Sequence, residues 1–174
     1  REWIDKGIEP VPISVNISRE YIHTFDVVGE MLHLVNKYDI PIKLLELEIT
    51  ETTDSEGVSD VVQKMKDAGF TMLMDDFGSG YSSLNMLQKT QFDVLKIDRG
   101  FLSEFMESSR GRKIISHTIS MSRDIGLDII AEGVETPEQA SFLSDCGCDS
   151  AQGFYYSKPI TQEEFDKMLV EVNK

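Results

Sequence analysis

Carboxylate and amide side chains recur near the ends of short apolar runs that are typical of buried strands. Asp75 and Asp76 directly follow the apolar residues 71–74, while Asn16 and Glu48 stand late in two earlier runs. Such an oxygen-rich set, with no histidine in a metal-ligand spacing, suits Mg²⁺ or Mn²⁺ better than Zn²⁺. Two hard cations about 4 Å apart can hold the attacking and leaving oxygens of a phosphoryl displacement. The pattern therefore predicts metal-dependent chemistry on a phosphate ester.

Three later runs carry the remaining candidates for this chemistry. Lys96 interrupts the buried run 94–98, where an unpaired charge would be costly. Lys96 could orient an attacking water or neutralise charge that develops on the phosphate. Glu132 and Glu135 could complete a metal shell or handle a proton, and Gln152 interrupts the last run. A network of ion pairs inside a barrel remains the alternative explanation.

These residues are distributed over a repeated strand–helix unit. The expected strands are residues 13–18, 44–50, 71–77, 94–98, 128–134 and 151–156. The expected helices are residues 20–38, 55–68, 82–89, 111–125, 137–145 and 162–172. Regular alternation of strand and helix predicts a mostly parallel sheet with right-handed crossovers.

Two architectures accommodate six such units: a doubly wound open sheet, or six-eighths of an eight-stranded barrel. No glycine-rich G-x-G-x-x-G turn follows the first strand, which disfavours a dinucleotide-binding fold. Polar residues stand near the carboxyl end of nearly every strand, and in a parallel barrel those ends converge on one face. We therefore predict an α/β fold, namely an incomplete TIM-like (β/α)₈ barrel with about six βα units.

Length and composition indicate one globular domain over residues 1–174. The net charge of −14 disfavours a nucleic-acid polymer as partner, because such binding relies on Lys and Arg. No apolar run approaches the ~20 residues of a membrane span, and no secretory signal is evident, so no membrane contact is expected. Cys146 and Cys148 form neither a zinc quartet nor a disulfide framework, and we expect reduced thiols in a cytoplasmic protein.

Six short strings occur in the chain in a fixed order. They are SVNIS at 14–18, ELEITE at 46–51, MDDFGSGYSSL at 74–84, LKIDR at 95–99, AEGVET at 131–136 and GCDSAQGFYYSKP at 147–159. Together they resemble successive motifs of the EAL domain, the family of bacterial cyclic-di-GMP phosphodiesterases. The resemblance implies a (β/α)₈-like barrel that hydrolyses cyclic-di-GMP to linear pGpG with two Mg²⁺ or Mn²⁺ ions.

The resemblance also implies roles for the metal-binding residues. Asn16, Glu48 and Asp75 would bind the first ion, and Asp75 would bridge to a second ion held by Asp76. Glu132 resembles the glutamate beside the metals that has been proposed as a general base.

The remaining positions would serve the water, the substrate and a loop. Lys96 resembles the lysine that contacts the catalytic water, and Asn16, Glu135 and Gln152 match substrate-binding positions. Glu51 resembles the residue that holds the loop following the aspartate pair and couples it to dimerisation. The two glycines of that loop allow unusual backbone angles, and the loop residues concerned are Gly78, Ser79 and Gly80.

The family's first strand, with its Glu-Ala-Leu motif, has no counterpart in this chain. Residues 1–7 resemble the end of the helix before the family's second strand, so we expect an N-terminally truncated EAL-type domain. Such a chain is expected to be inactive alone, or to assemble as a homodimer or a strand-swapped oligomer. The parent protein could carry a GGDEF or sensor domain. The alternatives are a non-catalytic cyclic-di-GMP-binding module and a regulatory half-barrel that binds neither ligand nor metal.

Overall fold

The computed structural model describes residues 1–24, 26–50, 57–80 and 83–172. Its strands form one parallel sheet whose spatial order follows the sequence. They are β1 (Ile13–Asn16), β2 (Leu45–Thr50), β3 (Thr71–Phe77), β4 (Val94–Ile97), β5 (Asp128–Ala131) and β6 (Ser150–Ala151). A doubly wound sheet would reverse its strand order part-way. The sequential order confirms the incomplete barrel of about six βα units.

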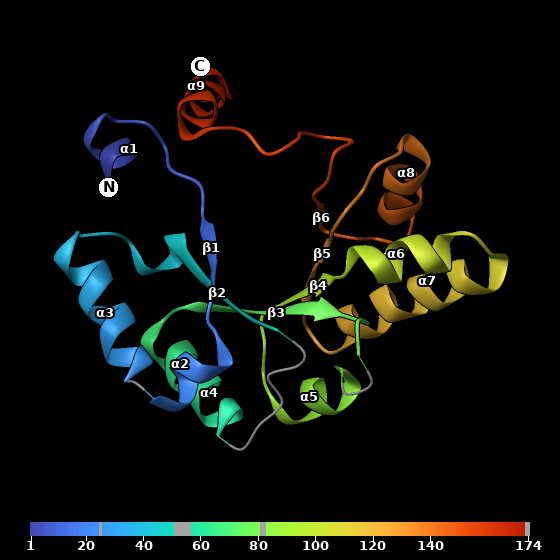
Figure 1. Ribbon diagram of the computed structural model, residues 1–174, viewed down its shortest axis with the longest axis horizontal. Helices are drawn as coiled ribbons and strands as arrows, with labels where there is room; N and C mark the ends of the chain where they lie inside the picture. Colours follow the sequence, from blue (N-terminus) through green and yellow to red (C-terminus); the bar gives the residue numbers. More distant parts are fainter. Residues whose placement is uncertain (25, 51–56, 81–82, 173–174) are drawn as a thin grey trace.

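Helices surround the strands, most of them on the outer side of this curved sheet and the first and last beside its open side (Figure 1). They are α1 (Glu2–Asp5), α2 (Arg19–Thr24), α3 (Val27–Lys37), α4 (Val58–Ala68), α5 (Ser83–Lys89), α6 (Arg99–Met106), α7 (Ser109–Asp124), α8 (Pro137–Asp145) and α9 (Gln162–Val172). A 3₁₀ turn, Ile42–Leu44, precedes β2. Among the described residues, no helix is both long and apolar enough to cross a bilayer.

Three expectations about these elements are wrong. The strand expected over residues 151–156 is observed only as Ser150–Ala151, and residues 154–156 form a turn. The single helix expected over residues 20–38 is divided, because the Asp26 side chain accepts a hydrogen bond from the Gly29 amide (3.1 Å) and starts α3 anew. Helix α6 was not expected at all. Its N-cap is Asp98, a residue assigned to the preceding strand, whose carboxylate accepts from the amides of Gly100 (2.7 Å) and Phe101 (3.2 Å).

The sheet separates apolar from polar side chains by the alternation of its strands. One face of β2, β3 and β4 packs against the helices through fully buried residues such as Leu47, Met72 and Leu95. A second core cluster joins β4 and β5 to α6, α7 and α8. The opposite face of the same strands carries Glu48 and Lys96, so the alternation that builds the core also places the polar site.

The two ends of the described chain meet. In Figure 1, α1 and α9 lie on the same side of the molecule. The indole Nε1 of Trp3 donates a hydrogen bond to Asp166 Oδ1 (2.7 Å), and the rings of Trp3 and Phe165 are 5.7 Å apart. This contact ties the segment before β1 to the segment after β6, the two outer strands of the sheet.

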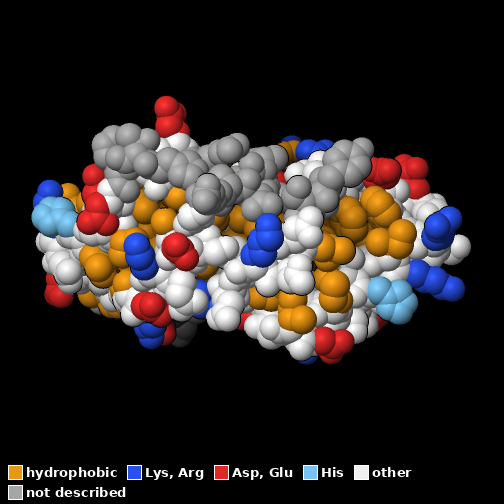
Figure 2. Space-filling view, turned by 90° about the horizontal axis from the view of Figure 1, so that it is seen from below, with side chains coloured by type: hydrophobic (Ala, Val, Ile, Leu, Met, Phe, Trp, Pro, Cys, Tyr) orange, Lys and Arg blue, Asp and Glu red, His pale blue; other side chains and the backbone are white. Residues whose placement is uncertain are grey.

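The outer surface mixes charged and apolar side chains. Figure 2, a view from the side of α4 and α5, shows several hydrophobic patches separated by charged and polar groups. Exposed apolar residues also occur along the edge strand β1, where Ile13 is 48% and Val15 38% exposed.

Candidate metal-binding and catalytic site

Adjacent aspartates in a regular strand would point to opposite faces of the sheet. In β3 the pairing register with β4 shifts between Met74 and Phe77, so one extra residue bulges at the aspartate pair. Asp76 adopts a positive φ of 60°, which a non-glycine residue rarely does. The strand was expected to relax at its end, but the adjustment occurs inside it. As a result Asp75 and Asp76 can serve one site.

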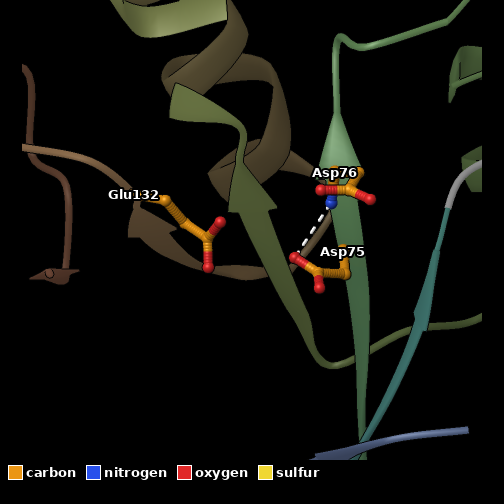
Figure 3. Close-up of side chains that lie close together, drawn as sticks. All are labelled: Asp75, Asp76 and Glu132. Carbon is orange, nitrogen blue, oxygen red and sulfur yellow. Dashed lines mark hydrogen bonds between the residues drawn. The ribbon is translucent and has the colours of Figure 1, made fainter. Parts of the chain in front are cut away.

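Three carboxylates gather around this bulge. Each of Asp75, Asp76 and Glu132 offers an oxygen atom, and these atoms all lie within 4.8 Å of one another (Figure 3). The Asp75 carboxylate also accepts a hydrogen bond from the Asp76 amide (2.9 Å), which fixes its orientation. Burial raises the pKa of Asp76, and the neighbouring charge of Asp75 raises it further.

Lys96 on β4 forms the centre of a buried ion-pair network that joins β2, β3 and the end of β5. Its Nζ atom lies 2.9 Å from Glu48 Oε1, 3.1 Å from Asp75 Oδ1 and 2.8 Å from Glu132 Oε1. Lys96, Glu48 and Asp75 are each less than a tenth exposed. Burial alone would lower the pKa of Lys96, but its carboxylate partners outweigh that effect and raise it. Lys96 is therefore a permanent cation and hydrogen-bond donor at neutral pH.

Glu132 is held from two sides. It directly follows β5. Its Oε1 atom contacts the Lys96 ammonium and accepts a hydrogen bond from the side-chain amide of Gln152, whose Nε2 lies 2.5 Å away. Burial raises the pKa of Glu132, whereas the Lys96 ammonium acts in the opposite direction. Gln152 is likewise the first residue after its strand, so strand ends bring the two side chains together.

Asn16 approaches the site from β1. It is the last residue of that strand and is paired in register with Glu48, so the two side chains share a face of the sheet. Asn16 is exposed, whereas Glu48 is buried. The structure thus places all five expected metal-binding residues at one end of the sheet.

The loop residues are only partly described. Glu51 lies outside the described residues. Gly78, Ser79 and Gly80 form the turn after β3, and the Ser79 amide donates to the Asp76 carbonyl (3.1 Å). Gly78 has a φ of +93°, and a Cβ atom there would lie 2.4 Å from the ring of Phe101. Glycine is required at this position by both the backbone and the packing.

Sequence reasoning missed one residue beside the site. Glu135 does not contact the Lys96 network directly; its carboxylate instead pairs with Arg99, at 2.7 Å from Nη2. Arg99 is the last residue of the string LKIDR, in which only the lysine was predicted to belong to the site. The position of Arg99, a cationic residue only three residues after Lys96, was the signal in the sequence that could have identified it.

The donor set fits a hard divalent cation. Its ligand atoms are carboxylate oxygens, and the described part of the chain brings no histidine or cysteine into the cluster. Buried like charges repel unless a cation compensates them, and oxygen ligands suit Mg²⁺ and Mn²⁺.

Comparison with known proteins identifies the family. The sequence model of the EAL domain matches residues 1–159. The chain belongs to the EAL domain family. Among curated EAL relatives, the bifunctional diguanylate cyclase/cyclic di-GMP phosphodiesterase MucR of Pseudomonas aeruginosa is 35% identical over 94% of this chain and 24% of its own length.

Solved EAL structures share the fold. The EAL domain of Mycobacterium smegmatis DcpA superposes with a TM-score of 0.91 at 32% identity, covering 99% of this chain and 79% of that one. The MucR phosphodiesterase in complex with c-di-GMP gives a TM-score of 0.85 at 34% identity, covering 94% and 68% respectively. The chain spans 21–29% of the full length of these curated relatives.

Proposed function

We propose that the parent protein of this chain hydrolyses cyclic-di-GMP to linear pGpG in a metal-dependent reaction, and that residues 1–174 are inactive alone or need to assemble. The observation that carries the proposal is the convergence of Asp75, Asp76 and Glu132 beside the buried Lys96 in an EAL chain. The relative MucR is named as a cyclic di-GMP phosphodiesterase, and its solved structure holds c-di-GMP.

The metal-binding residues would supply oxygen ligands to two neighbouring ions. Asn16, Glu48 and Asp75 would hold one Mg²⁺ or Mn²⁺ ion, and Asp75 and Asp76 a second, with Glu132 completing the shell. Bound ions would supply Lewis-acid polarisation of the phosphodiester and of the attacking water. The buried setting strengthens these electrostatic interactions relative to water.

Lys96 and Glu132 would handle the water and its proton. The Lys96 ammonium can only donate hydrogen bonds, so it would orient the attacking water and stabilise charge on the phosphate oxygens. Glu132 can accept a proton and is held in place by Gln152. Asn16, Glu135 and Gln152 would contact the substrate, while Glu51 would support the turn formed by residues 78–80.

The exposed edge of the sheet supports a proposal about assembly. All four residues of β1 are exposed, which leaves a strand edge open to pairing with another strand. We expect the chain to be inactive as a monomer and to gain activity only as a homodimer or a strand-swapped oligomer. The combined activities of MucR support an upstream GGDEF or sensor domain in the parent protein.

Replacement of the bridging aspartate tests the function. Asp75→Asn should lower pGpG formation by at least about a hundredfold in Mn²⁺, because one change weakens both metal positions. Product is measured by chromatography over a range of protein concentrations. Metal-dependent binding of cyclic-di-GMP without any pGpG from the unaltered chain would instead identify a non-catalytic binding module. Substantial turnover by the variant would reject the bridging role.

A further inference from the structure

The backbone of Asp76 has a conformation that needs support from its surroundings. Its φ of +60° is rarely adopted by a residue other than glycine, and such a conformation persists only where neighbouring structure fixes it. The register shift between Met74 and Phe77 makes the backbone irregular, but it does not determine where the Asp76 carboxylate points. Contacts to the residues that follow Asp76 must therefore contribute to its orientation.

The Phe101 side chain lies against both residues that follow Asp76. A Cβ atom on Gly78 would lie 2.4 Å from Phe101 Cδ2 and 2.7 Å from Phe101 Cγ, so the ring rests directly on the backbone of the turn. The rings of Phe77 and Phe101 meet edge to face, with centroids 6.1 Å apart and planes at 75°. Phe77 belongs to the first core cluster and Phe101 packs against the second, so this contact joins the two.

Phe101 is itself fixed from two sides. Its amide donates to Asp98 Oδ1 (3.2 Å) at the start of α6, and the Asp98 amide donates to the Phe77 carbonyl (3.2 Å). Its ring also stacks on Phe105, with centroids 4.4 Å apart. A Cβ atom on Gly111 would lie 2.0 Å from the Phe105 carbonyl oxygen, so α7 packs closely against this end of α6. The ring is thus a fixed support for the turn after β3.

Asp75 is held by a different contact. Its carboxylate lies 3.1 Å from Lys96 Nζ and is 11% exposed as a side chain, whereas Asp76 is only half-buried (Figure 3). Loss of the Phe101 ring would therefore leave Asp75 paired with Lys96 and release Asp76 from the cluster.

We propose that Phe101 is a positioning residue for Asp76, whose carboxylate it keeps at the metal site through Phe77 and Gly78. The inference rests on the proposed function, because Asp76 serves there as a ligand of the second ion. Phe101 touches neither metal nor substrate in this role and acts only through the turn.

Mn²⁺ binding tests the inference without requiring turnover. Free Mn²⁺ is measured by electron paramagnetic resonance as the metal is titrated into the protein, and Asp76→Asn identifies the ion that depends on Asp76. Phe101→Ala should lower the affinity for that ion by at least about tenfold, as is usual when a residue that orients a metal ligand is lost. Phe101→Leu fills more of the same space, so it should lower the affinity less and remain folded.

A double-mutant cycle shows whether Phe101 acts through Asp76. In the Asp76→Asn background, Phe101→Ala should cause no further loss of Mn²⁺ affinity. Phe142→Ala is the matched control, because Phe142 also packs partly buried against the second core cluster but lies beneath Arg112, whose guanidinium carbon is 5.9 Å from its ring centroid. This control should lower the melting temperature and keep the Mn²⁺ affinity of the unaltered chain.

The outcomes separate this inference from the proposed function. Unchanged Mn²⁺ affinity in a folded Phe101 variant, or an equal loss of affinity with and without the Asp76 carboxylate, would overturn the inference alone. An unaltered chain that binds no Mn²⁺ would overturn the metal site on which both this inference and the proposed function rest.

Discussion

At the scale of single residues, Lys96 is the cation on which the acidic site depends. Its ammonium group contacts three carboxylates and is 7% exposed as a side chain. Removing one partner from a buried ion-pair network leaves uncompensated charge, which costs far more than the pair itself contributes. The stability of this site is thus linked to its charge balance.

We expect Lys96→Met to lower the free energy of unfolding by about 3 kcal/mol in EDTA, because Glu48, Asp75 and Glu132 lose their shared cation. Saturating Mn²⁺ should restore part of the loss, since a bound cation replaces the missing charge. Urea unfolding with and without metal measures both effects. An equal loss under the two conditions would argue against metal binding at these carboxylates.

The Cys148 thiol offers a second test at this scale. Burial raises its pKa to about 11, and its Sγ–H group donates to backbone carbonyls. The reactive thiolate forms only as pH rises towards that value, so alkylation at pH 8 should be about a hundredfold slower than for an unperturbed thiol. Iodoacetamide labelling of a Cys146→Ser variant, with the urea-unfolded protein as control, measures the rate. Rapid labelling in the folded state would contradict the burial of Cys148.

At the scale of elements, the turn after β3 fixes the aspartate pair against α6. Gly78 combines a φ of +93° with contact to the Phe101 ring, and Phe101 lies in the first turn of α6, next to the Asp98 cap. The turn, the bulge of β3 and the start of α6 therefore form one packed unit.

Gly78→Ala should cost about 2–4 kcal/mol of unfolding free energy, from backbone strain plus the clash with Phe101. Gly57→Ala is the matched control, because Gly57 has nearly the same φ (+94°) but no atom of the described residues lies within 4 Å of a Cβ atom there. Its loss should be about 1 kcal/mol. Equal losses in thermal or urea unfolding would show that packing against α6 contributes nothing.

At the scale of the whole molecule, the contact between α1 and α9 joins the two ends of an otherwise open sheet. Trp3 is the only tryptophan of the chain, so its fluorescence reports this contact directly. The joining of distant ends favours a single cooperative unfolding transition.

Asp166→Asn should weaken the hydrogen bond from the Trp3 indole and lower stability by about 1 kcal/mol, with a change in tryptophan emission. Unfolding followed by fluorescence and by far-UV circular dichroism should still coincide. Loss of the fluorescence signal at lower urea than the dichroism would show instead that the chain ends separate before the sheet unfolds.

The number of strands and their succession along the chain could be predicted from the sequence alone, since strand-like apolar runs are local signals. The helix expected over residues 137–145 is α8, and the structure closes a capping box between Thr136 and Gln139 at its start. The division of the helix at Asp26 and the existence of α6 escaped detection. Both depend on whether an aspartate side chain caps a helix, and the neighbouring residues alone do not decide this.

Only the tertiary structure decided how the candidate residues meet. The sequence placed polar groups at strand ends, but the bulge at Asp75 and Asp76 depends on pairing between β3 and β4. The Arg99–Glu135 contact likewise joins the first residue of α6 to the segment before α8, 36 residues apart in the chain. Local signals specify elements because they act through neighbouring residues. Contacts between loops arise only when the sheet brings their strands together, and that geometry determines the chemistry available to each side chain.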